Sequence, residues 1–491
     1  MTELKKQEFW FVVGSQILYG AEVLETVAKR AKEMSEKLSE SLPCKLVYKG
    51  TIKSADEATQ IMKEANYADE CCGVVTWCHT FSPSKMWIEG LRLLQKPYCH
   101  FATQYNRSIP DDEIDMDFMN LNQSAHGDRE HGFLGARMRL ARKVIMGYWQ
   151  DEEPIRELGE WMRAAVGYRF SRNLRIMRFG DNMREVAVTE GDKVETQIKL
   201  GWMVNTWPVG YLVEEMAKVT EAEIEAKMAE YRERYALNTD DLASVRYQAL
   251  EEVAMKRIFE REKIGAFSNT FQDLYGLKQL PGLASQNLMA DRYGYGGEGD
   301  WKVAGMTAVI MAMTEGMSGG TTFIEDYTYN LEKGNEYSLG AHMLEVGPSI
   351  AAEQPKIEVH ALGIGDREAP ARLVFEGKPG KAIVVTLIDM GGRMRMILQD
   401  IECVKPIYQM RNLPVARVMW KAMPDLCTGT KMWILAGGAH HSVLTYDASA
   451  EMLADFAEMN EIEFVHITKD TTVEGLKQQL FLNDLAWKLK C

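Results

Sequence analysis

Long apolar runs are the first thing that this 491-residue sequence lacks. Near its start, only Phe9–Val13 are continuously apolar before Gly14 interrupts them. Such a run is too short for a membrane span or for the core of a signal peptide. We therefore expect a cytoplasmic protein that does not enter a membrane.

Positive charge is scarce as well. The chain has 57 Lys and Arg against 71 Asp and Glu, which gives a formal net charge of −14, and no long basic run occurs. A protein that binds a nucleic-acid backbone usually presents an excess of Lys and Arg on one face. We therefore predict no nucleic-acid partner.

Cysteine is too rare for a disulfide scaffold, with eight in the whole chain. Cys71, Cys72, Cys78 and Cys99 lie in apolar, strand-like stretches, and the spacing from Cys72 to Cys78 is not that of a zinc knuckle. Free cysteines in such places usually behave as small buried apolar residues. No catalytic or metal-binding cysteine is predicted.

Linkers and low-complexity tracts are also absent, although the chain is too long for one hydrophobic core. The first part alternates strands such as FWFVV and CCGVVTW with amphipathic helices, and a second alternating block starts near residue 174. After about residue 330, short strand-like runs are separated by Gly, Pro and Asp. We predict an α/β protein with two doubly wound (Rossmann-like) parallel-sheet domains, 1–172 and 173–328, and a mainly antiparallel, barrel-like C-terminal domain with terminal helices, 329–491.

Some local patterns support narrower expectations. In a parallel sheet, ligands bind beyond the carboxyl ends of the strands, which makes the turns GSQILYG and HTFSPSKMW candidate binding loops. The stretch FLGARMRLARKVIMGYW is predicted to form one basic amphipathic helix, and WILA before GGAHH is predicted to be a buried strand.

A glycine-rich loop, YGYGGEGDW, formally fits the dinucleotide fingerprint through Gly294, Gly296 and Gly299. The preceding segment has a helical pattern instead of a strand pattern, and Glu298 would face a pyrophosphate with a like charge. The loop is better explained as a tight turn that presents Glu298 at the start of the apolar helix WKVAGMTAVIMAM. A nicotinamide enzyme remains a weaker hypothesis.

Acids and histidines near this loop suggest a metal site with an acid/base function. Glu298 precedes the helix, Glu325 and Asp326 lie on the next strand, and His342 follows. Adjacent residues on a regular strand point to opposite faces, so only one of Glu325 and Asp326 can face a shared site. By the same argument, only one of the paired histidines in GGAHH can reach a given metal. Helix capping, surface ion pairs and core packing are the alternative roles.

Eight stretches, several of them ten residues or longer, carry a resemblance to a known family: WCHTFSPSKMW, IDMDFMNLNQSAHGDRE, RFGDNMREVAVTEGDKV, DLYGLKQLPGLA, GYGGEGDWK, IEDYTYNLEKG, GAHMLEV and WILAGGAHH. Through them the sequence resembles the L-arabinose isomerases along nearly its whole length. The resemblance implies interconversion of L-arabinose and L-ribulose, with conversion of D-galactose to D-tagatose as a further reaction.

The resemblance also implies the site residues. The metal ligands would be Glu298, Glu325, His342 and His441, with the two glutamates also transferring the proton. Family members are homohexamers with active sites near subunit contacts, so some substrate contacts are expected from a neighbouring chain. The implied substrate-binding residues are Gln16, Leu18, Phe81, Gln123, His126, Met183, Phe271 and Tyr327.

Small departures from the family pattern occur where Ala, Thr, Gly and Thr are expected. They are Gly297, Ser124, Asp128 and Ser442, and none removes a ligand. They leave an isomerase of another sugar, such as L-fucose or D-galactose, as an alternative. A sugar-binding protein of the same fold without catalysis is the second alternative.

The chemistry of the implied residues agrees with isomerisation. Two carboxylates and two imidazoles leave two positions of an octahedral shell for the sugar, and this donor set suits Mn²⁺, with Co²⁺ or Mg²⁺ also possible. One glutamate is expected to remove the C2 proton of the open-chain aldose, and the proton returns at C1 through an enediol. Either glutamate can serve as the first base.

Overall fold

The computed structural model describes residues 4–364 and 366–489, and the chain divides into two compact units. Unit 1 runs up to Arg169 and also contains Glu451–Met459 from late in the chain. Unit 2 consists of Phe170–Ala450 and of the chain from Asn460 onward. In the described part of the chain, no helix has both the length and the apolar character that crossing a membrane requires.

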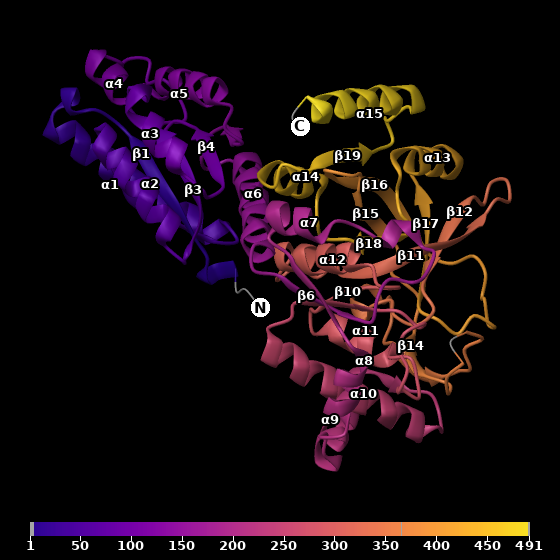
Figure 1. The fold of residues 1–491 in the computed structure, drawn as a ribbon. Helices are drawn as coiled ribbons and strands as arrows, with labels where there is room; N and C mark the ends of the chain where they lie inside the picture. The colour runs from indigo at the N-terminus through magenta and orange to yellow at the C-terminus, as the bar shows by residue number, and fades with distance from the viewer. Residues whose placement is uncertain (1–3, 365, 490–491) are drawn as a thin grey trace. The chain divides into compact units, whose positions relative to one another are not determined.

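A five-stranded parallel sheet forms the centre of unit 1, with the strand order β2-β1-β3-β4-β5 (Figure 1). Along β1, Phe9, Phe11 and Val13 pack on the side of α1 and α6, while Trp10 and Val12 pack on the side of α2. A strand that is apolar on both faces is what a parallel sheet covered by two helix layers requires. The strands are β1 (Glu8–Gly14), β2 (Lys45–Ile52), β3 (Cys71–Cys78), β4 (Tyr98–Ala102) and β5 (Lys143–Met146), and the helices are α1 (Ala21–Ser41), α2 (Ala55–Tyr67), α3 (Ile88–Leu93), α4 (Met116–Leu121), α5 (Ser124–Met138) and α6 (Glu152–Ser171).

Unit 2 begins with a second parallel sheet, of four strands in the order β10-β9-β6-β7. The two parallel sheets confirm the predicted pair of α/β layers. The strands are β6 (Arg175–Phe179), β7 (Met203–Trp207), β9 (Ala266–Asn269) and β10 (Gly294–Gly296), and the helices are α7 (Lys193–Leu200), α8 (Val209–Met216), α9 (Glu221–Arg234), α10 (Leu242–Glu262), α11 (Gly282–Ala290) and α12 (Trp301–Met313).

The rest of unit 2 is built on a mainly antiparallel sheet, as predicted. Because β15 pairs with both β16 and β18, six strands close into a barrel in the order β15-β18-β11-β12-β17-β16, and β19 adds to β16 in parallel. The strands are β11 (Thr321–Asn330), β12 (Tyr337–Ala341), β15 (Gly380–Asp389), β16 (Met394–Val404), β17 (Arg417–Ala422), β18 (His441–Thr445) and β19 (Glu463–Ile467). A small sheet of β8 (Ala236–Leu237), β13 (Lys356–Val359) and β14 (Ala371–Val374) and the helices α13 (Leu426–Ala436), α14 (Ala450–Met459) and α15 (Val473–Lys488) complete the chain.

Helix α12 connects the two halves of unit 2. All of its residues are buried, and it contacts β9 and β10 of the parallel sheet as well as β15 and β18 of the barrel. A helix that is apolar on every side is stable only when protein covers it all round. The sequence correctly predicted this buried helix, whose first turn follows Glu298.

Two local predictions were wrong. The stretch predicted as one basic helix contains the end of α5 at Met138, where Arg139 adopts a left-handed conformation, and then strand β5 at the edge of the sheet. The WILA segment is the last turn of α13, which Gly437 ends with φ at 85°, and the strand starts only at His441. The first stretch joins the end of a helix to an edge strand of only four residues, and WILA is too short for periodicity to separate strand from helix. The four cysteines expected in the core are buried.

Candidate active site

Glu298 lies in the short loop between β10 and α12, at a place set by glycines. A Cβ atom on Gly296 would lie 2.2 Å from the Asp300 carbonyl oxygen, and one on Gly294 would lie 2.3 Å from that of Ala304. The glycines therefore allow β10 and α12 to pack closely, which explains the fingerprint-like spacing without a nucleotide. Glu298 itself has φ at +57°, which a residue with a side chain rarely adopts. Such backbone strain is often found at functional sites.

Strand register brings the other predicted ligands together. On β11, Glu325 pairs with His441 of β18 on one side and with Ala341 of β12 on the other, and His342 follows directly after β12. The ring of Phe323 packs edge-on against both histidines, with centroid distances of 4.9 Å to His342 and 5.2 Å to His441. Three segments that are far apart in the sequence thus supply three neighbouring side chains.

The distances link these side chains into one cluster. Glu298 Oε2 lies 3.8 Å from His441 Nε2, and Glu325 Oε2 lies 3.9 Å from His342 Nε2. The two histidine rings are 5.9 Å apart between centroids. The fold therefore brings Glu298, Glu325, His342 and His441 together.

Each of the two predicted histidine ligands has a carboxylate behind it. His342 Nδ1 lies 2.5 Å from Glu345 Oε2, and His441 Nδ1 lies 3.3 Å from Asp300 Oδ2. A carboxylate that accepts from Nδ1 leaves Nε2 free to bind a metal, and this arrangement is common behind metal-binding histidines.

The site passes a direct test of fit for a metal. His441 is fully buried, and among the described residues its Nε2 atom has no hydrogen-bond partner. A buried nitrogen without a partner is costly unless something binds it. Because imidazole and carboxylate oxygens are suitable ligands for a divalent cation, the residues present fit such an ion.

His440, the first of the paired histidines, also approaches Glu298. Its Nε2 lies 3.7 Å from Glu298 Oε2, and Glu298, His440 and His441 offer ligand atoms close enough together to hold a metal. His440 is 35% exposed, however, whereas His441 has Asp300 behind it. The expectation that only one of the paired histidines can approach a shared ion was therefore wrong, because His440 lies before β18 and the alternation of a regular strand does not apply to it. The two histidines differ in burial and in the carboxylate behind the ring.

The charges around the site act on both acids and bases. Burial would lower the pKa of His342, but the charge and hydrogen bond of Glu345, followed by the charges of Glu325 and Glu298, raise it to about 9. Burial would raise the pKa of Glu298, but its interaction with His440 and the charges of the neighbouring histidines lower it. The cluster therefore favours an ionised Glu298 carboxylate and a protonated His342 imidazole.

A cavity of about 110 Å³ opens beside these groups. Glu298, Glu325 and His342 line it, together with Phe271 and Tyr327, two of the predicted substrate-binding residues. Met183, the third from unit 2, donates its backbone N–H to the Glu298 carbonyl oxygen at 2.9 Å. Asp326 is not among the lining residues, in line with the expectation that only one of the adjacent acids faces the site.

The remaining predicted substrate-binding residues belong to unit 1, where they form one face at the carboxyl ends of β1 and β3. The Tyr19 hydroxyl donates to Gln123 Oε1 at 2.8 Å, and the rings of Phe81 and His126 are 4.2 Å apart. Gln16 is the N-cap residue of the short helix η2 (Ile17–Tyr19) that follows β1, and Leu18 lies within that helix. Because β1 and β3 are the neighbouring strands at which the order of the sheet reverses, this face is where such folds bind ligands.

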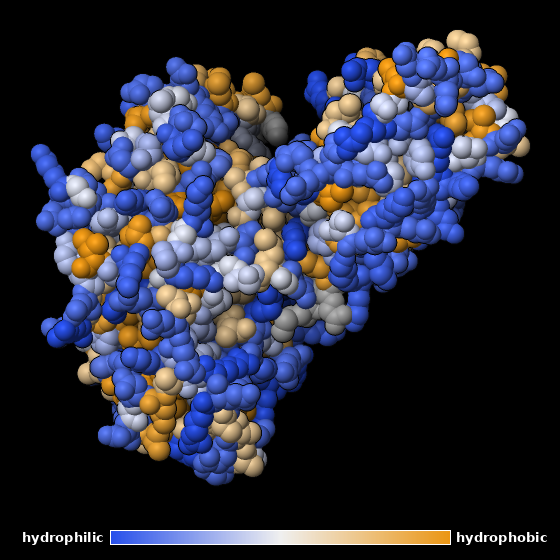
Figure 2. Space-filling view, turned by 180° about the vertical axis from the view of Figure 1, so that it is seen from behind, coloured by the Kyte–Doolittle hydropathy of each residue, from blue (hydrophilic) through white to orange (hydrophobic). Residues whose placement is uncertain are grey.

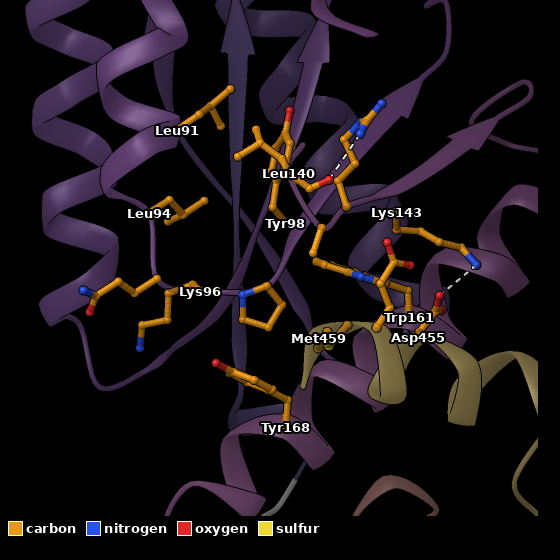
Figure 3. Close-up of a pocket in the computed structure, with 15 residues that line it drawn as sticks. Leu91, Leu94, Lys96, Tyr98, Leu140, Lys143, Trp161, Tyr168, Asp455 and Met459 are labelled. Carbon is orange, nitrogen blue, oxygen red and sulfur yellow. Dashed lines mark hydrogen bonds and ion pairs between the residues drawn. The ribbon is translucent and has the colours of Figure 1, made fainter. Parts of the chain in front are cut away.

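Unit 1 has another cavity, of about 220 Å³, at the amino ends of β4 and β5 (Figure 3). Apolar side chains such as Leu94 and Leu140 line it, and Lys143 reaches Asp455 at 3.3 Å on one side. None of the predicted site residues lines this cavity. Size alone therefore does not identify the site of the chemistry.

The sequence-based prediction did not include the residues behind the ligands. Asp300 and Glu345 stand two and three residues after Glu298 and His342, in the stretches EGD and HMLE. Their positions close to predicted ligands in the sequence could have indicated that these acids hydrogen-bond to ligand side chains. Phe323 gave no such indication, because its contact with both histidines depends on strand pairing.

Comparisons with known proteins point to one family along the whole chain. Residues 3–173 match the family described as L-arabinose isomerase N-terminal domain, residues 175–316 the central domain and residues 320–463 the C-terminal domain. The chain is 51% identical to the L-arabinose isomerase of Thermotoga maritima, covering 100% of this chain and 99% of that protein. It is also 51% identical to L-arabinose isomerase 1 of Bacillus licheniformis, covering 100% of both, and 50% identical to the enzyme of Geobacillus stearothermophilus, covering 99% of this chain and 100% of the relative.

Proposed function

The chain belongs to the L-arabinose isomerase family, and we propose that it interconverts L-arabinose and L-ribulose at the cluster of Glu298, Glu325, His342 and His441. The reaction is an aldose–ketose isomerisation, in which a proton moves between C2 and C1 of the open-chain sugar through an enediol. The observation that carries this assignment of residues is their convergence from four separate segments of unit 2.

The proposed ligands of a divalent ion are the two glutamates and the Nε2 atoms of His342 and His441. Support comes from the unpartnered Nε2 of His441 and from the carboxylates behind both rings. Oxygen and imidazole donors favour Mn²⁺, with Co²⁺ or Mg²⁺ as substitutes. When bound, such an ion supplies Lewis acidity toward the carbonyl and the neighbouring hydroxyl of the sugar.

The protein's own part in the reaction is proton transfer. One of Glu298 and Glu325 takes the C2 proton, and a carboxyl group returns a proton at C1. The hydroxyl proton passes from O2 to O1 in the same conversion, so that the atoms balance. The lowered pKa of Glu298 keeps this group ionised near neutral pH and ready to act as a base. Buried Tyr295 and Leu280 line the cavity and limit the water that reaches the enediol.

The proposed substrate-binding residues are Met183, Phe271 and Tyr327 in unit 2, and Gln16, Leu18, Phe81, Gln123 and His126 in unit 1. A cavity of about 110 Å³ in unit 2 is smaller than the roughly 300 Å³ at which ligand sites usually begin. Additional protein surface must therefore complete the site. We propose a homohexamer in which a neighbouring copy supplies part of it.

An apolar stripe on α15 supports an assembly. Within this 16-residue helix, only Leu476 is fully buried, whereas Phe481, Leu482 and Leu485 are exposed, as is Leu489 just beyond it. Figure 2 shows apolar side chains gathered over α15. A contiguous apolar surface of this kind is typical of a protein–protein contact.

A six-carbon sugar is proposed as a further substrate, with D-galactose converted to D-tagatose in the cytosol. The support is Gly297, which stands where the resemblance led us to expect Ala. A Cβ atom there would lie 3.0 Å from the ring of His342, so glycine removes a methyl group at the site. Relative rates on L-arabinose, D-galactose and L-fucose test the preference.

The decisive experiment incubates the purified protein with L-arabinose after chelation, with and without added Mn²⁺, and assays ketose. We expect ketose only with the ion, and no turnover by Glu298→Gln although its circular dichroism is unchanged. Glu353→Gln, at an exposed position, is the matched control. Near-normal turnover by Glu298→Gln would overturn the assignment, and an undiminished Mn²⁺ affinity of His441→Asn would move the ligand role to His440.

A further inference from the structure

A buried polar network fastens helix α5 to the central sheet of unit 1. Asp128 Oδ1 lies 2.9 Å from His100 Nε2, and His100 Nδ1 lies 2.9 Å from Thr76 Oγ1. Thr76 Oγ1 lies 3.0 Å from the Tyr98 hydroxyl, which in turn hydrogen-bonds to His131 Nε2. The network therefore starts and ends on α5, and it passes through β3 and β4.

Proton counting gives each link of the network a direction. Burial raises the pKa of Asp128 to about 8, while burial and the charge of Arg142 lower the pKa of His100 to about 4. Near neutral pH the pair is therefore a carboxylic acid that donates to a neutral imidazole. The His100 Nδ1–H then donates to Thr76, which donates to Tyr98, whose hydroxyl donates to His131.

The part of α5 nearest to Asp128 carries two of the proposed substrate contacts. Gln123 is the N-cap residue of α5, and His126 is exposed in its first turn, with its ring against Phe81. At Gly127 the helix approaches β3 so closely that a Cβ atom would lie 2.6 Å from the Cβ of Cys78. The position of the substrate face therefore depends on how the first turns of α5 are held against the sheet.

We propose that Asp128, by donating to His100, is a positioning residue that fixes Gln123 and His126 for the sugar. This inference rests on the proposed substrate face of unit 1. Asp128 is one of the positions at which the sequence departs from the family pattern, and its carboxyl group points into the network and is nearly buried. The departure is therefore explained by packing under α5, without a direct contact to the sugar.

The test compares Asp128→Ala with Asp128→Asn in the full-length protein loaded with Mn²⁺. The alanine variant leaves His100 Nε2 without its donor, and we expect the KM for L-arabinose to rise about tenfold while kcat changes less than about twofold. The amide of the asparagine variant can still donate to His100, so this variant should recover most of the affinity. The Mn²⁺ affinity should be the same in all forms, because the ligands lie in unit 2. Asp117→Ala, an exposed acid on α4, is the matched control.

Hydrogen exchange separates positioning from a general loss of stability. In the alanine variant, amides 124–131 should exchange faster, while those of β1 and α1 keep their rates. If that variant does not fold, Asp128→Ser provides the same comparison, because its side chain is too short to reach His100. An unchanged KM and unchanged exchange would overturn the proposal, as would an asparagine variant that behaves like alanine.

Failure of the proposed function gives a different result. If His126→Ala and Gln123→Ala both leave the KM unchanged, the substrate face of unit 1 is wrong and Asp128 has nothing to position. If either of them raises the KM while Asp128→Ala does not, the substrate face of unit 1 is supported and only the positioning role of Asp128 is wrong.

Discussion

Asp300 combines two roles in one side chain. Its Oδ1 accepts from the backbone N–H groups of Lys302 and Val303 at 3.2 Å, which caps α12, and its Oδ2 faces His441 Nδ1. Lys302 Nζ lies 3.5 Å from the same carboxylate, and both residues are buried. The same acid thus fixes the start of the helix and the orientation of the imidazole.

Replacing Asp300 by Asn should weaken metal binding without unfolding the protein. The amide oxygen can still cap α12, but the negative charge behind His441 is lost. We expect the Mn²⁺ affinity to fall about tenfold to a hundredfold, as for other changes behind metal-binding histidines. Isothermal titration calorimetry measures this. Asp425→Asn, which alters the N-cap of α13 instead, should keep the affinity, and equal losses in both variants would contradict the prediction.

The raised pKa of His342 predicts that metal binding depends on pH. A folded-state pKa of about 9 means that the imidazole carries a proton at neutral pH, and an ion must displace it from Nε2. The apparent Mn²⁺ affinity should therefore rise with pH, by up to about tenfold per unit between pH 7 and 9, and level off above that. Calorimetry in two buffers of different ionisation enthalpy should show about one proton released at pH 7.5. Release of none would show that His342 is not a ligand.

At the scale of the elements, the contact between β10 and α12 sets the place of Glu298. Gly296→Ala would insert a methyl group 2.2 Å from the Asp300 carbonyl oxygen, so α12 must shift. We expect a loss of about 1–3 kcal/mol in the free energy of unfolding, together with weaker Mn²⁺ binding. Denaturant titration and calorimetry measure the two effects.

Gly210→Ala is the control for this change. Gly210 lies in α8, and a Cβ atom there would have no neighbour within 4 Å in the described part of the chain. An alanine at that position should stabilise the protein slightly, by about 0.5–1 kcal/mol, because glycine is a poor helix former. A Gly296→Ala variant as stable as Gly210→Ala would show that β10 and α12 can separate at little cost.

The sequence predicted those elements whose character is local. The apolar stretch from Trp301 to Met313 indicated a buried helix, and the strand around Glu325 was clear from its composition. That Glu325 would stand opposite His441 could not be predicted from local pattern, because strand pairing across long separations depends on the whole sheet. The family resemblance supplied what the pattern lacked. It did not supply the network around Asp128, a position at which this chain departs from the family pattern.

At the scale of the whole molecule, we expect subunit assembly to depend on the exposed apolar residues of α15. If the exposed leucines on α15 are buried in a subunit contact, replacing each one by a charged residue should weaken the free energy of association by about 1.5–3 kcal/mol. Leu482→Asp combined with Leu485→Asp should therefore give a smaller particle in light scattering coupled to size exclusion. The domain borders predicted after residues 172 and 328 stay predictions.

Val194→Asp is the control for this change, because Val194 is an exposed apolar residue on a different helix, α7. It should leave the particle mass unchanged. An unchanged mass in the α15 double variant would contradict the role of the stripe, and activity measured alongside would show whether assembly is needed to complete the site.

The closure of the barrel fixes the register between its strands. In an open sheet, an edge strand can slide by two residues and keep its buried face. In a ring of six strands, each neighbour pair constrains the next, so a slip at β11 would have to be repeated around the whole circle. The spacing between Glu325 and His441 is thus protected by a closed loop of hydrogen bonds, and it should tolerate substitutions in the surrounding turns far better than substitutions in the ring.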